Sequence, residues 1–234
     1  MGRIQRKRLG RGVYHIINRA LDGRWILGDE SDREKFLYYL LRFSLVHKVQ
    51  IYHWSLMANH YHIAVETLDA STLSRWLGNT QSRFSLYYHK RHGGKGPLWQ
   101  SRFRSVMVQK EGYLGRLGRY IERNALRANI DGVESPWDYR WCSAKTYVLE
   151  VPDEMVDPTR HPFWESMGLD DQDRRAAFAR YLLNDEEALE DEKLFRRASE
   201  IIGDDKFHSQ ITVDSGRLTA RKRGRPKSSS DHKK

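Results

Sequence analysis

The sequence predicts an α+β fold, a ferredoxin-like split β-α-β arrangement in which an antiparallel sheet carries helices on one face. Three observations support this prediction. Four segments have the short apolar or alternating pattern of strands, and two longer segments have the apolar stripe of amphipathic helices. Their order along the chain is β-α-β-β-α-β, with a further helix and a small C-terminal helical region after it.

The first strand and the first helix begin the predicted core. Residues 12–18, GVYHIIN, alternate between two faces, as a half-buried strand requires. The following helix is expected to begin at the sequence SDRE, where Ser31 and Glu34 have the spacing of a capping box. Residues 49–57, VQIYHWSLM, are rich in aliphatic and aromatic side chains and are predicted to be the second strand.

The second half of the core repeats this pattern. Ala58-Asn59 offers a turn, after which residues 60–66 are predicted to return as the third strand. A second helix is predicted from Ser71 to about Arg91, and it ends at a run of three glycines and a proline. Residues 97–108 are predicted to be the fourth strand. A third helix is expected from about Glu111 to Ala128.

We expect three parts along the chain, a domain over residues 1–150, an accessory helical region over 151–215 and a basic tail over 216–234. The accessory region is acidic, because residues 165–205 hold 13 Asp or Glu against 6 Lys or Arg. Helical patterning there is strongest at residues 176–183 and 193–202. The tail has eight Lys or Arg, one Asp and no apolar face, which predicts disorder when it is free.

The overall charge favours a polyanionic partner, of which phosphate backbones are the commonest. The chain has 41 Lys or Arg against 31 Asp or Glu, a net charge of +10. One cysteine, Cys142, excludes an internal disulfide framework and a multi-cysteine zinc site, and it fits a reducing compartment. The basic N-terminus is not followed by an apolar run, and no segment is long enough to span a bilayer. We therefore expect a soluble, cytoplasmic protein with no membrane partner.

The stretch MANHYHIAVE, residues 57–66, places two histidines on one face of the third strand. Because side chains alternate along a strand, His60 and His62 point the same way and Tyr61 points to the helix layer. Imidazoles spaced in this way can share one metal ion. A His-x-His pair alone is more often structural, so a metal site needs a third ligand.

The third helix supplies candidates for that ligand and for a nucleophile. One stripe of the helix contains Tyr113, Leu117, Tyr120 and Asn124. Ordinary core packing explains Leu117, whereas a buried Asn124 needs hydrogen-bond partners or a metal ion. Three glycines, Gly112, Gly115 and Gly118, each cost a helix about 1 kcal/mol relative to alanine. They fit a helix that lies close to the sheet or shifts during a reaction.

A second set of residues is suited to DNA binding. In the predicted fourth strand, Gln100, Arg102 and Arg104 alternate onto one face, which fits contact with a phosphate backbone. Further candidates are Arg19, Lys90, Arg91, Arg116, Arg119, Arg123 and Arg127, with Arg223 and Arg225 in the tail. A solvated basic surface would explain any one of these residues. It explains less well why all of them are expected around one site. The tail sequence RKRGRPK resembles an AT-hook, and a simple electrostatic tether is an equal alternative.

These motifs together resemble the REP-associated tyrosine transposases, IS200-like members of the single-tyrosine HUH superfamily. MANHYHIAV resembles the family's His-hydrophobic-His motif, and RYIERNALRA resembles its nucleophile helix. GVYHIINR, GPLWQSRFRSVMV and SPWDYRWCSA also agree, so the resemblance covers roughly residues 12–145. The chain departs from the family pattern at Ala58 and Ala125, where proline is usual, and at Tyr61, where a smaller aliphatic residue is usual.

The resemblance implies a site and a reaction. His60, His62 and Asn124 would be ligands of a divalent ion, Mg²⁺ or Mn²⁺, on a sheet that is the palm of an HUH nuclease. Tyr120 would attack single-stranded DNA beside a repetitive extragenic palindrome hairpin, giving a 5′-phosphotyrosine and a free 3′-hydroxyl. Tyr113 is the rival nucleophile, but no metal-binding residue lies four positions after it.

Two other functions are compatible with the sequence. A domesticated DNA-binding protein could keep the fold without cleaving, although the complete set of His60, His62, Tyr120 and Asn124 argues against this. An RNA-binding module could use the same kind of sheet, but the expected aromatic pair on neighbouring strands is missing. A nucleoid-associated monomer or homodimer is expected, with the tyrosine helix supplied in cis or in trans.

Overall fold

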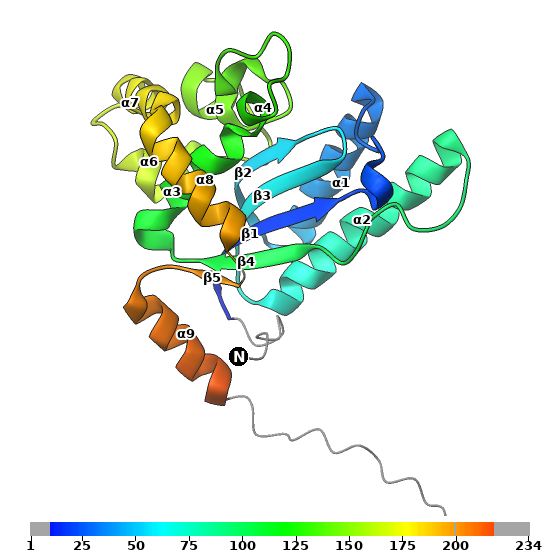
Figure 1. Cartoon of the computed structure of the whole chain (residues 1–234), viewed down its shortest axis with the longest axis horizontal. Coiled ribbons are helices and arrows are strands. Elements are labelled where there is room, and N and C mark those ends of the chain that lie inside the picture. Colours follow the sequence, from blue (N-terminus) through cyan, green and yellow to red (C-terminus); the bar gives the residue numbers. More distant parts are fainter. Residues whose placement is uncertain (1–9, 199, 218–234) are drawn as a thin grey trace, which may run out of the picture.

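A five-stranded sheet forms the centre of the computed structural model, which describes residues 10–198 and 200–217 (Figure 1). The strands lie in the order β2-β3-β1-β4-β5. Their bounds are Gly12–Arg19 for β1, Gln50–Leu56 for β2, His60–Thr67 for β3, Arg104–Val108 for β4 and Ile201–Ile202 for β5. Neighbouring strands are antiparallel except β4 and β5. The first four strands have the order of a split β-α-β fold, as predicted.

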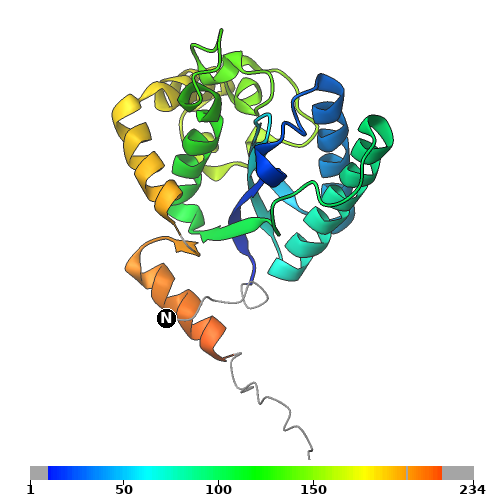
Figure 2. The ribbon, with the colours of Figure 1, turned by 45° about the vertical axis from the view of Figure 1, so that its right-hand side comes forward.

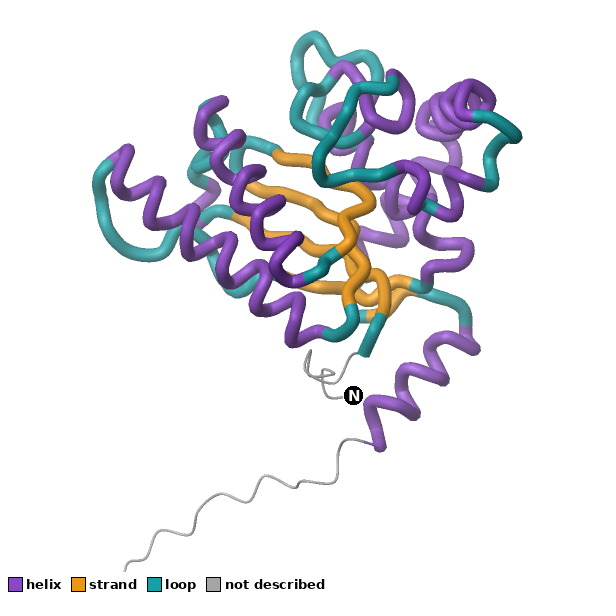
Figure 3. The backbone as a smooth tube through the Cα atoms, turned by 180° about the vertical axis from the view of Figure 1, so that it is seen from behind, coloured by secondary structure: helices purple, strands orange, loops and turns teal. Residues whose placement is uncertain are grey.

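Two long helices cover one face of the sheet, as Figures 2 and 3 show. They are α1 (Glu30–His47) and α2 (Ala70–His92), and they enclose the larger apolar core. Tyr61 of β3 points into this core, where its ring centroid lies 5.1 Å from that of Phe36 on α1. Because residues alternate along β3, the burial of Tyr61 turns His60 and His62 to the opposite face.

The cap of α1 differs from the prediction. The helix begins at Glu30, and the carboxylate of Asp29 accepts hydrogen bonds from the backbone N–H groups of Ser31 at 2.8 Å and Asp32 at 3.3 Å. The expected capping box of Ser31 and Glu34 was therefore wrong. Asp29 lies two residues earlier, and its carboxylate satisfies N–H groups of the first turn.

The fourth strand is shorter than predicted. Only Arg104–Val108 pairs with β1, and the preceding residues form a loop held by backbone hydrogen bonds from Leu21 to Leu98, at 2.8 Å, and from Gln100 to Arg19, at 3.0 Å. Gln100 and Arg102 therefore do not share a strand face with Arg104, and this part of the prediction was wrong. Both side chains are exposed.

The opposite face of the sheet carries α3 (Lys110–Glu122), followed by the short α4 (Asn124–Arg127). The single helix predicted over 111–128 is thus divided at Arg123, and its first turn is interrupted at Gly112, which has a φ of +76°. The close approach to the sheet that the glycines suggested is confirmed for Gly118, whereas Gly115 lies close to Phe163 of the accessory region. A β-carbon on Gly118 would collide with the His53 ring on β2, and one on Gly115 would collide with the ring of Phe163.

The C-terminal region is mostly helical. Its elements are η3 (Pro136–Asp138), α5 (Ala144–Leu149), η4 (Pro158–Arg160), α6 (Pro162–Glu165), α7 (Asp171–Leu183), α8 (Asp185–Arg197) and α9 (Asp205–Arg217), and a short η2 (Leu21–Gly23) precedes α1. The helical pattern at 193–202 was wrong at its end, because Ile201 and Ile202 form β5 along the free edge of β4. Arg223 and Arg225 lie outside the described residues. No helix in the described ranges is long and apolar enough to cross a membrane.

A buried chain of hydrogen bonds joins α3 to the sheet and to the accessory region. The backbone N–H of Trp164 donates to Nδ1 of His161, so Nε2 of His161 carries a proton and donates to Nε2 of His53 at 2.9 Å. Nδ1 of His53 in turn donates to an oxygen of the Glu122 carboxyl group at 2.9 Å, and the Ser143 hydroxyl donates to the same oxygen at 2.5 Å. Glu122 is the last residue of α3, so this chain sets the position of the helix end.

Removing the acceptor of this chain should destabilise the protein. In Glu122→Ala, two buried donors, His53 Nδ1 and Ser143 Oγ, lose their partner, which costs about 1–3 kcal/mol for each. We expect urea unfolding at pH 7 to show a loss of about 2–5 kcal/mol. Glu122→Gln keeps an accepting oxygen in a side chain of the same shape and should lose less. Equal losses in the two variants would contradict the role of these hydrogen bonds.

Candidate active site

The structure brings His60, His62 and Tyr120 together on the α3 face of the sheet. The ring centroids of His60 and His62 are 5.4 Å apart. The Tyr120 ring meets the His62 ring edge to face, with centroids 5.7 Å apart. Asn124 follows Tyr120 by one helical turn and is buried, with 7% of its surface exposed. Three of the four predicted site residues thus meet through ring contacts, and the fourth lies next to Tyr120 along the helix.

A third histidine belongs to this cluster and was missed in the sequence. Nε2 of His15 on β1 lies 2.9 Å from Nδ1 of His62, and the His15 ring centroid is 5.6 Å from that of Tyr120. The alternation of residues 12–18 gave the signal that His15 lies on one strand face. That this face is the one with His62 depends on the pairing of β1 with β3, which a strand pattern alone does not reveal.

The two imidazoles of β3 fit a metal ion. Nδ1 of His60 lies 2.7 Å from the side-chain oxygen of Asn59, and Nδ1 of His62 faces His15, so neither Nε2 is engaged with a described residue. Burial, helped by the nearby charges of Arg19 and Arg127, lowers the pKa of His60 to about 4. Burial also lowers the pKa of His62. Both rings are therefore neutral at pH 7, as metal ligation requires.

Arg127 connects the nucleophile candidate to the third ligand candidate. One guanidinium nitrogen donates to the backbone oxygen of Tyr120 at 2.8 Å, and another donates to the Asn124 side-chain oxygen at 2.6 Å. The guanidinium carbon also lies over the Tyr120 ring, 4.2 Å from its centroid. A carboxamide oxygen has two lone pairs, so Asn124 Oδ1 keeps one for a metal ion.

The Tyr120 phenol is nearly closed off, with 8% of the residue exposed. Phe195 of α8 packs on it, with ring centroids 5.3 Å apart. This burial raises the pKa of Tyr120, while the Arg127 charge acts in the opposite direction. The phenol is therefore protonated at pH 7 and must lose its proton to act as a nucleophile. Tyr113, the rival, is half-buried beneath the Arg116 guanidinium.

The arginines of α3 do not form the open basic surface that we expected. Asp191 of α8 accepts from Arg116 at 2.6 Å and from Arg119 at 2.7 Å. Glu187 also pairs with Arg119, and Asp185 pairs with Arg123. The expectation that these arginines crowd one open site was wrong, because the acidic region packs on the outer face of α3.

The other basic residues predicted to bind DNA differ in whether a carboxylate pairs with them. Arg91 is paired with Asp29 and Asp32, at 2.8 and 2.7 Å. By contrast, no described carboxylate pairs with any of Arg19, Lys90, Arg102, Arg104 and Arg127. Arg104 lies opposite Ile17 on β1, on the face of the histidines, and its charge helps to lower the pKa of His15. The predicted DNA-binding residues left without a carboxylate partner therefore lie outside α3, and two of them, Arg19 and Arg104, are on the sheet.

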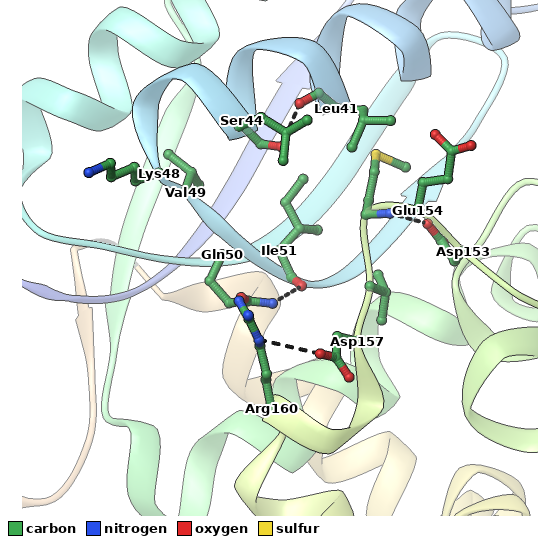
Figure 4. Close-up of a pocket in the computed structure, with 13 residues that line it drawn as sticks. Leu41, Ser44, Lys48, Val49, Gln50, Ile51, Asp153, Glu154, Asp157 and Arg160 are labelled. Atoms are coloured by element: carbon green, nitrogen blue, oxygen red, sulfur yellow. Dashed lines mark hydrogen bonds and ion pairs between the residues drawn. The ribbon is translucent and has the colours of Figure 1, made fainter.

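A separate cavity of roughly 580 Å³ lies beside the start of β2, between α1 and residues 153–160 (Figure 4). It is at the opposite end of β2 from the turn that leads to His60. Three of its polar side chains are engaged with one another. Arg160, for example, pairs with Asp157 at 3.3 Å and donates to Gln50 at 3.0 Å. We therefore place the candidate site at the histidines and not in this cavity.

Comparison with known proteins identifies the family of the N-terminal part of the chain. Residues 10–124 match the model of the family described as "Transposase IS200 like", from β1 through Asn124. Residues 10–124 belong to the IS200-like transposase family. His15, His60, His62, Tyr120 and Asn124 all lie inside the segment that matches this transposase family, whereas α7 and α8 lie outside it.

One solved structure shares the fold of this transposase chain. It is a REP-associated tyrosine transposase bound to a REP hairpin, with a TM-score of 0.53 and 14% sequence identity. The similarity covers 67% of this chain and 92% of the other. At this identity the likeness establishes the fold, and it confirms the predicted α+β class. No curated protein matches the chain.

The buried imidazoles predict how stability depends on pH. Burial lowers the pKa of His15 and of His53 to about 3, so below the ordinary value near 6.5 the unfolded chain binds protons that the folded chain does not. The free energy of unfolding should therefore fall as pH drops from about 6.5 towards 3, by up to about 1.4 kcal/mol per pH unit for each ring.

Urea unfolding with a chelator at pH 7 and pH 5 measures this slope. Glu122 acts in the opposite direction, because burial raises the pKa of its carboxyl to about 8. Glu122 is a single group, whereas several imidazoles are buried. The free energy of unfolding is therefore still expected to fall as the pH drops. His15→Gln should have a smaller loss between pH 7 and pH 5 than the unmodified protein. Equal stability at the two pH values would contradict the neutral, buried state of these rings.

Proposed function

We propose that this IS200-like transposase is a metal-dependent endonuclease and strand transferase that acts on single-stranded DNA through Tyr120. The observation that carries the proposal is the position of the phenol. Its ring lies against both His62 and His15, with the Arg127 guanidinium over its face. A tyrosine held between imidazoles and a free cation is suited to attack on a phosphodiester.

In the proposed reaction, Tyr120 Oη loses its proton and attacks the phosphorus. The bond from phosphorus to the 3′-oxygen breaks, and the leaving 3′-oxygen takes up a proton in place of the one lost from the phenol, which leaves a 5′-phosphotyrosine and a free 3′-hydroxyl. A 3′-hydroxyl can then attack the phosphotyrosine and reseal the strand without ATP, because the phosphodiester energy is kept. The charge of Arg127 favours the phenolate, and Arg104 is placed to attract the phosphate.

The metal ligands in this proposal are Nε2 of His60, Nε2 of His62 and Oδ1 of Asn124. A bound Mg²⁺ or Mn²⁺ would supply positive charge that polarises the scissile phosphate. Two imidazole nitrogens with one oxygen lean towards Mn²⁺, since imidazole is a softer ligand than carboxylate or water. The Asn59 and His15 contacts orient the two rings, as partners of metal-ligating histidines do.

The proposed substrate is a REP-type hairpin with a single-stranded flank. Support comes from the solved relative, which was bound to a REP hairpin, and from the unpaired arginines on the sheet side of the site. Tyr120 meets the histidines of its own sheet. This supports catalysis in cis, so that a monomer suffices and a homodimer need not exchange helices.

The alternative function is DNA binding without cleavage. One observation favours it, because Phe195 and the burial of Tyr120 leave little room for a phosphodiester at the phenol. The two functions differ in whether a covalent product forms, and the first experiment below separates them.

The nucleophile can be tested with a 5′-phosphotyrosine assay. A hairpin oligonucleotide with a flank, labelled on the side 3′ to the scissile phosphate, should become covalently attached to the protein with Mn²⁺, as seen by denaturing gel electrophoresis. Tyr120→Phe should abolish the adduct, because the phenol oxygen is absent. Tyr113→Phe is the matched control and should retain it. Loss of the adduct in Tyr113→Phe alone would reassign the nucleophile, and tight binding with no adduct for any divalent ion would favour the alternative function.

The ligands can be tested by metal titration. His60→Ala and His62→Ala should each weaken Mn²⁺ binding, measured calorimetrically, and lower the adduct yield by about 100-fold, since each removes one of three ligands. Asn124→Ala should do the same, and Asn124→Asp should recover much of the binding because it restores an oxygen ligand. Unchanged Mn²⁺ affinity in both histidine variants would exclude this ligand set.

A further inference from the structure

We propose that Trp25 is a stacking platform for an unpaired base of the single-stranded flank, with Arg19 and Arg24 binding the adjacent phosphates. The proposal rests on the proposed function and deepens it by naming the surface that leads the strand to the histidines. Residues 20–29 connect β1 to α1 and carry Arg24 and Trp25, and Arg19 is the last residue of β1.

Trp25 projects from an otherwise anchored loop. The residue is 74% exposed, whereas the next two, Ile26 and Leu27, are completely buried. A single exposed apolar residue needs no explanation by itself. Here, however, the two residues that follow the exposed indole are anchored in the core. Their burial fixes the backbone at Trp25 and keeps its ring directed to solvent.

Hydrogen bonds hold this loop in place on both sides. The backbone N–H of Leu27 donates to the oxygen of Ala58 at 2.9 Å, and the Arg24 guanidinium donates to the oxygen of Pro97 at 2.8 Å. The N–H of Gly28 donates to the oxygen of Trp25 at 3.1 Å, which closes a tight turn behind the indole. A pre-ordered aromatic ring loses little conformational entropy when a base stacks on it.

The loop is connected directly to the candidate active site. The side-chain nitrogen of Asn59 donates to the oxygen of Gly23 at 3.3 Å, and its side-chain oxygen is the 2.7 Å partner of His60 Nδ1. One side chain therefore links the Trp25 loop to the first histidine of the pair. A strand passing over the loop would reach the metal ligands within a short distance.

The charge around the loop suits phosphate. Arg19 is exposed, and neither it nor Arg24 pairs with any carboxylate of the described residues. Two nearby carboxylates are already occupied, since Asp29 pairs with Arg91 and Glu30 pairs with Arg140. Asp22, which lies on the loop itself, is exposed and leaves the two arginines in excess by one charge. This contrasts with α3, whose arginines are neutralised by α8. A cation beside an exposed aromatic ring is the usual pattern for single-strand binding without base readout.

Binding measured without metal tests the stacking independently of cleavage. Two oligonucleotides share one hairpin, and only one carries the single-stranded flank. Trp25→Ala should weaken binding of the flanked hairpin about tenfold, the size expected for loss of one stacked base, and leave the flankless hairpin unchanged. Trp25→Phe should retain most of the affinity. The matched control is Tyr38→Ala, which removes an aromatic ring that is 48% exposed on α1 and should leave both affinities unchanged.

A spectroscopic readout identifies the ring itself. Part of the tryptophan fluorescence should be quenched when the flanked hairpin binds, and Trp25→Phe should remove that part. Thermal unfolding of each variant, unchanged from the unmodified protein, excludes misfolding as the cause. Equal weakening of both oligonucleotides, no weakening in Trp25→Ala, or quenching that persists in Trp25→Phe would each overturn the proposal.

The outcomes also separate this proposal from the proposed function. If no adduct forms but flank-dependent binding is lost in Trp25→Ala, the stacking surface stands and the cleavage reaction fails. If the adduct forms and Trp25→Ala changes neither binding nor adduct yield, the stacking surface alone fails. If the unmodified protein does not distinguish the flanked from the flankless hairpin, the stacking proposal is excluded whatever the adduct assay gives.

Discussion

The contact between α3 and β2 at Gly118 controls the geometry of the candidate site. With no side chain at this position, the helix lies directly against the His53 ring, and any β-carbon would push it away. The next turn then carries Tyr120 to the rings of His15 and His62. The hydrogen bond from His53 to Glu122 adds a polar link at the helix end. One glycine and one buried hydrogen bond therefore set both the depth and the end of the helix that carries the phenol.

The acidic accessory region takes part in this arrangement, which its composition alone does not show. Its carboxylates neutralise the outer face of α3, whereas Arg19 on β1 and Arg104 on β4 have no carboxylate partner among the described residues. A basic protein therefore presents an uneven surface, with one helix neutralised internally and the end of the sheet left cationic. Phe195, on the same α8, packs on Tyr120. The region that balances the charge of α3 thus also covers the candidate nucleophile.

The sequence was sufficient for the parts of the fold that depend on local periodicity. Alternation predicted β1 and β3, and the apolar stripe predicted α2, within one or two residues. The site residues were assigned largely by resemblance, because a His-x-His pair alone is weak and Asn124 alone is ambiguous. His15, the pairing of Arg116, Arg119 and Arg123 with α8, and the loop before β4 were missed for a common physical reason. Each depends on contacts between segments far apart in sequence, and no local pattern records such contacts.

The electrostatics of the site connect metal binding to DNA binding. The cations nearest the histidines, Arg19, Arg104 and Arg127, all lower the pKa of at least one imidazole, so the site is positive before any metal arrives. In the proposed function, a divalent cation entering beside Arg127 would meet repulsion, while a phosphodiester would be attracted. Once the phosphate is present, its charge offsets that repulsion, and each ligand then favours the other. In the proposed function, a site with this positive charge would hold a metal ion mainly when the strand to be cut is already in place.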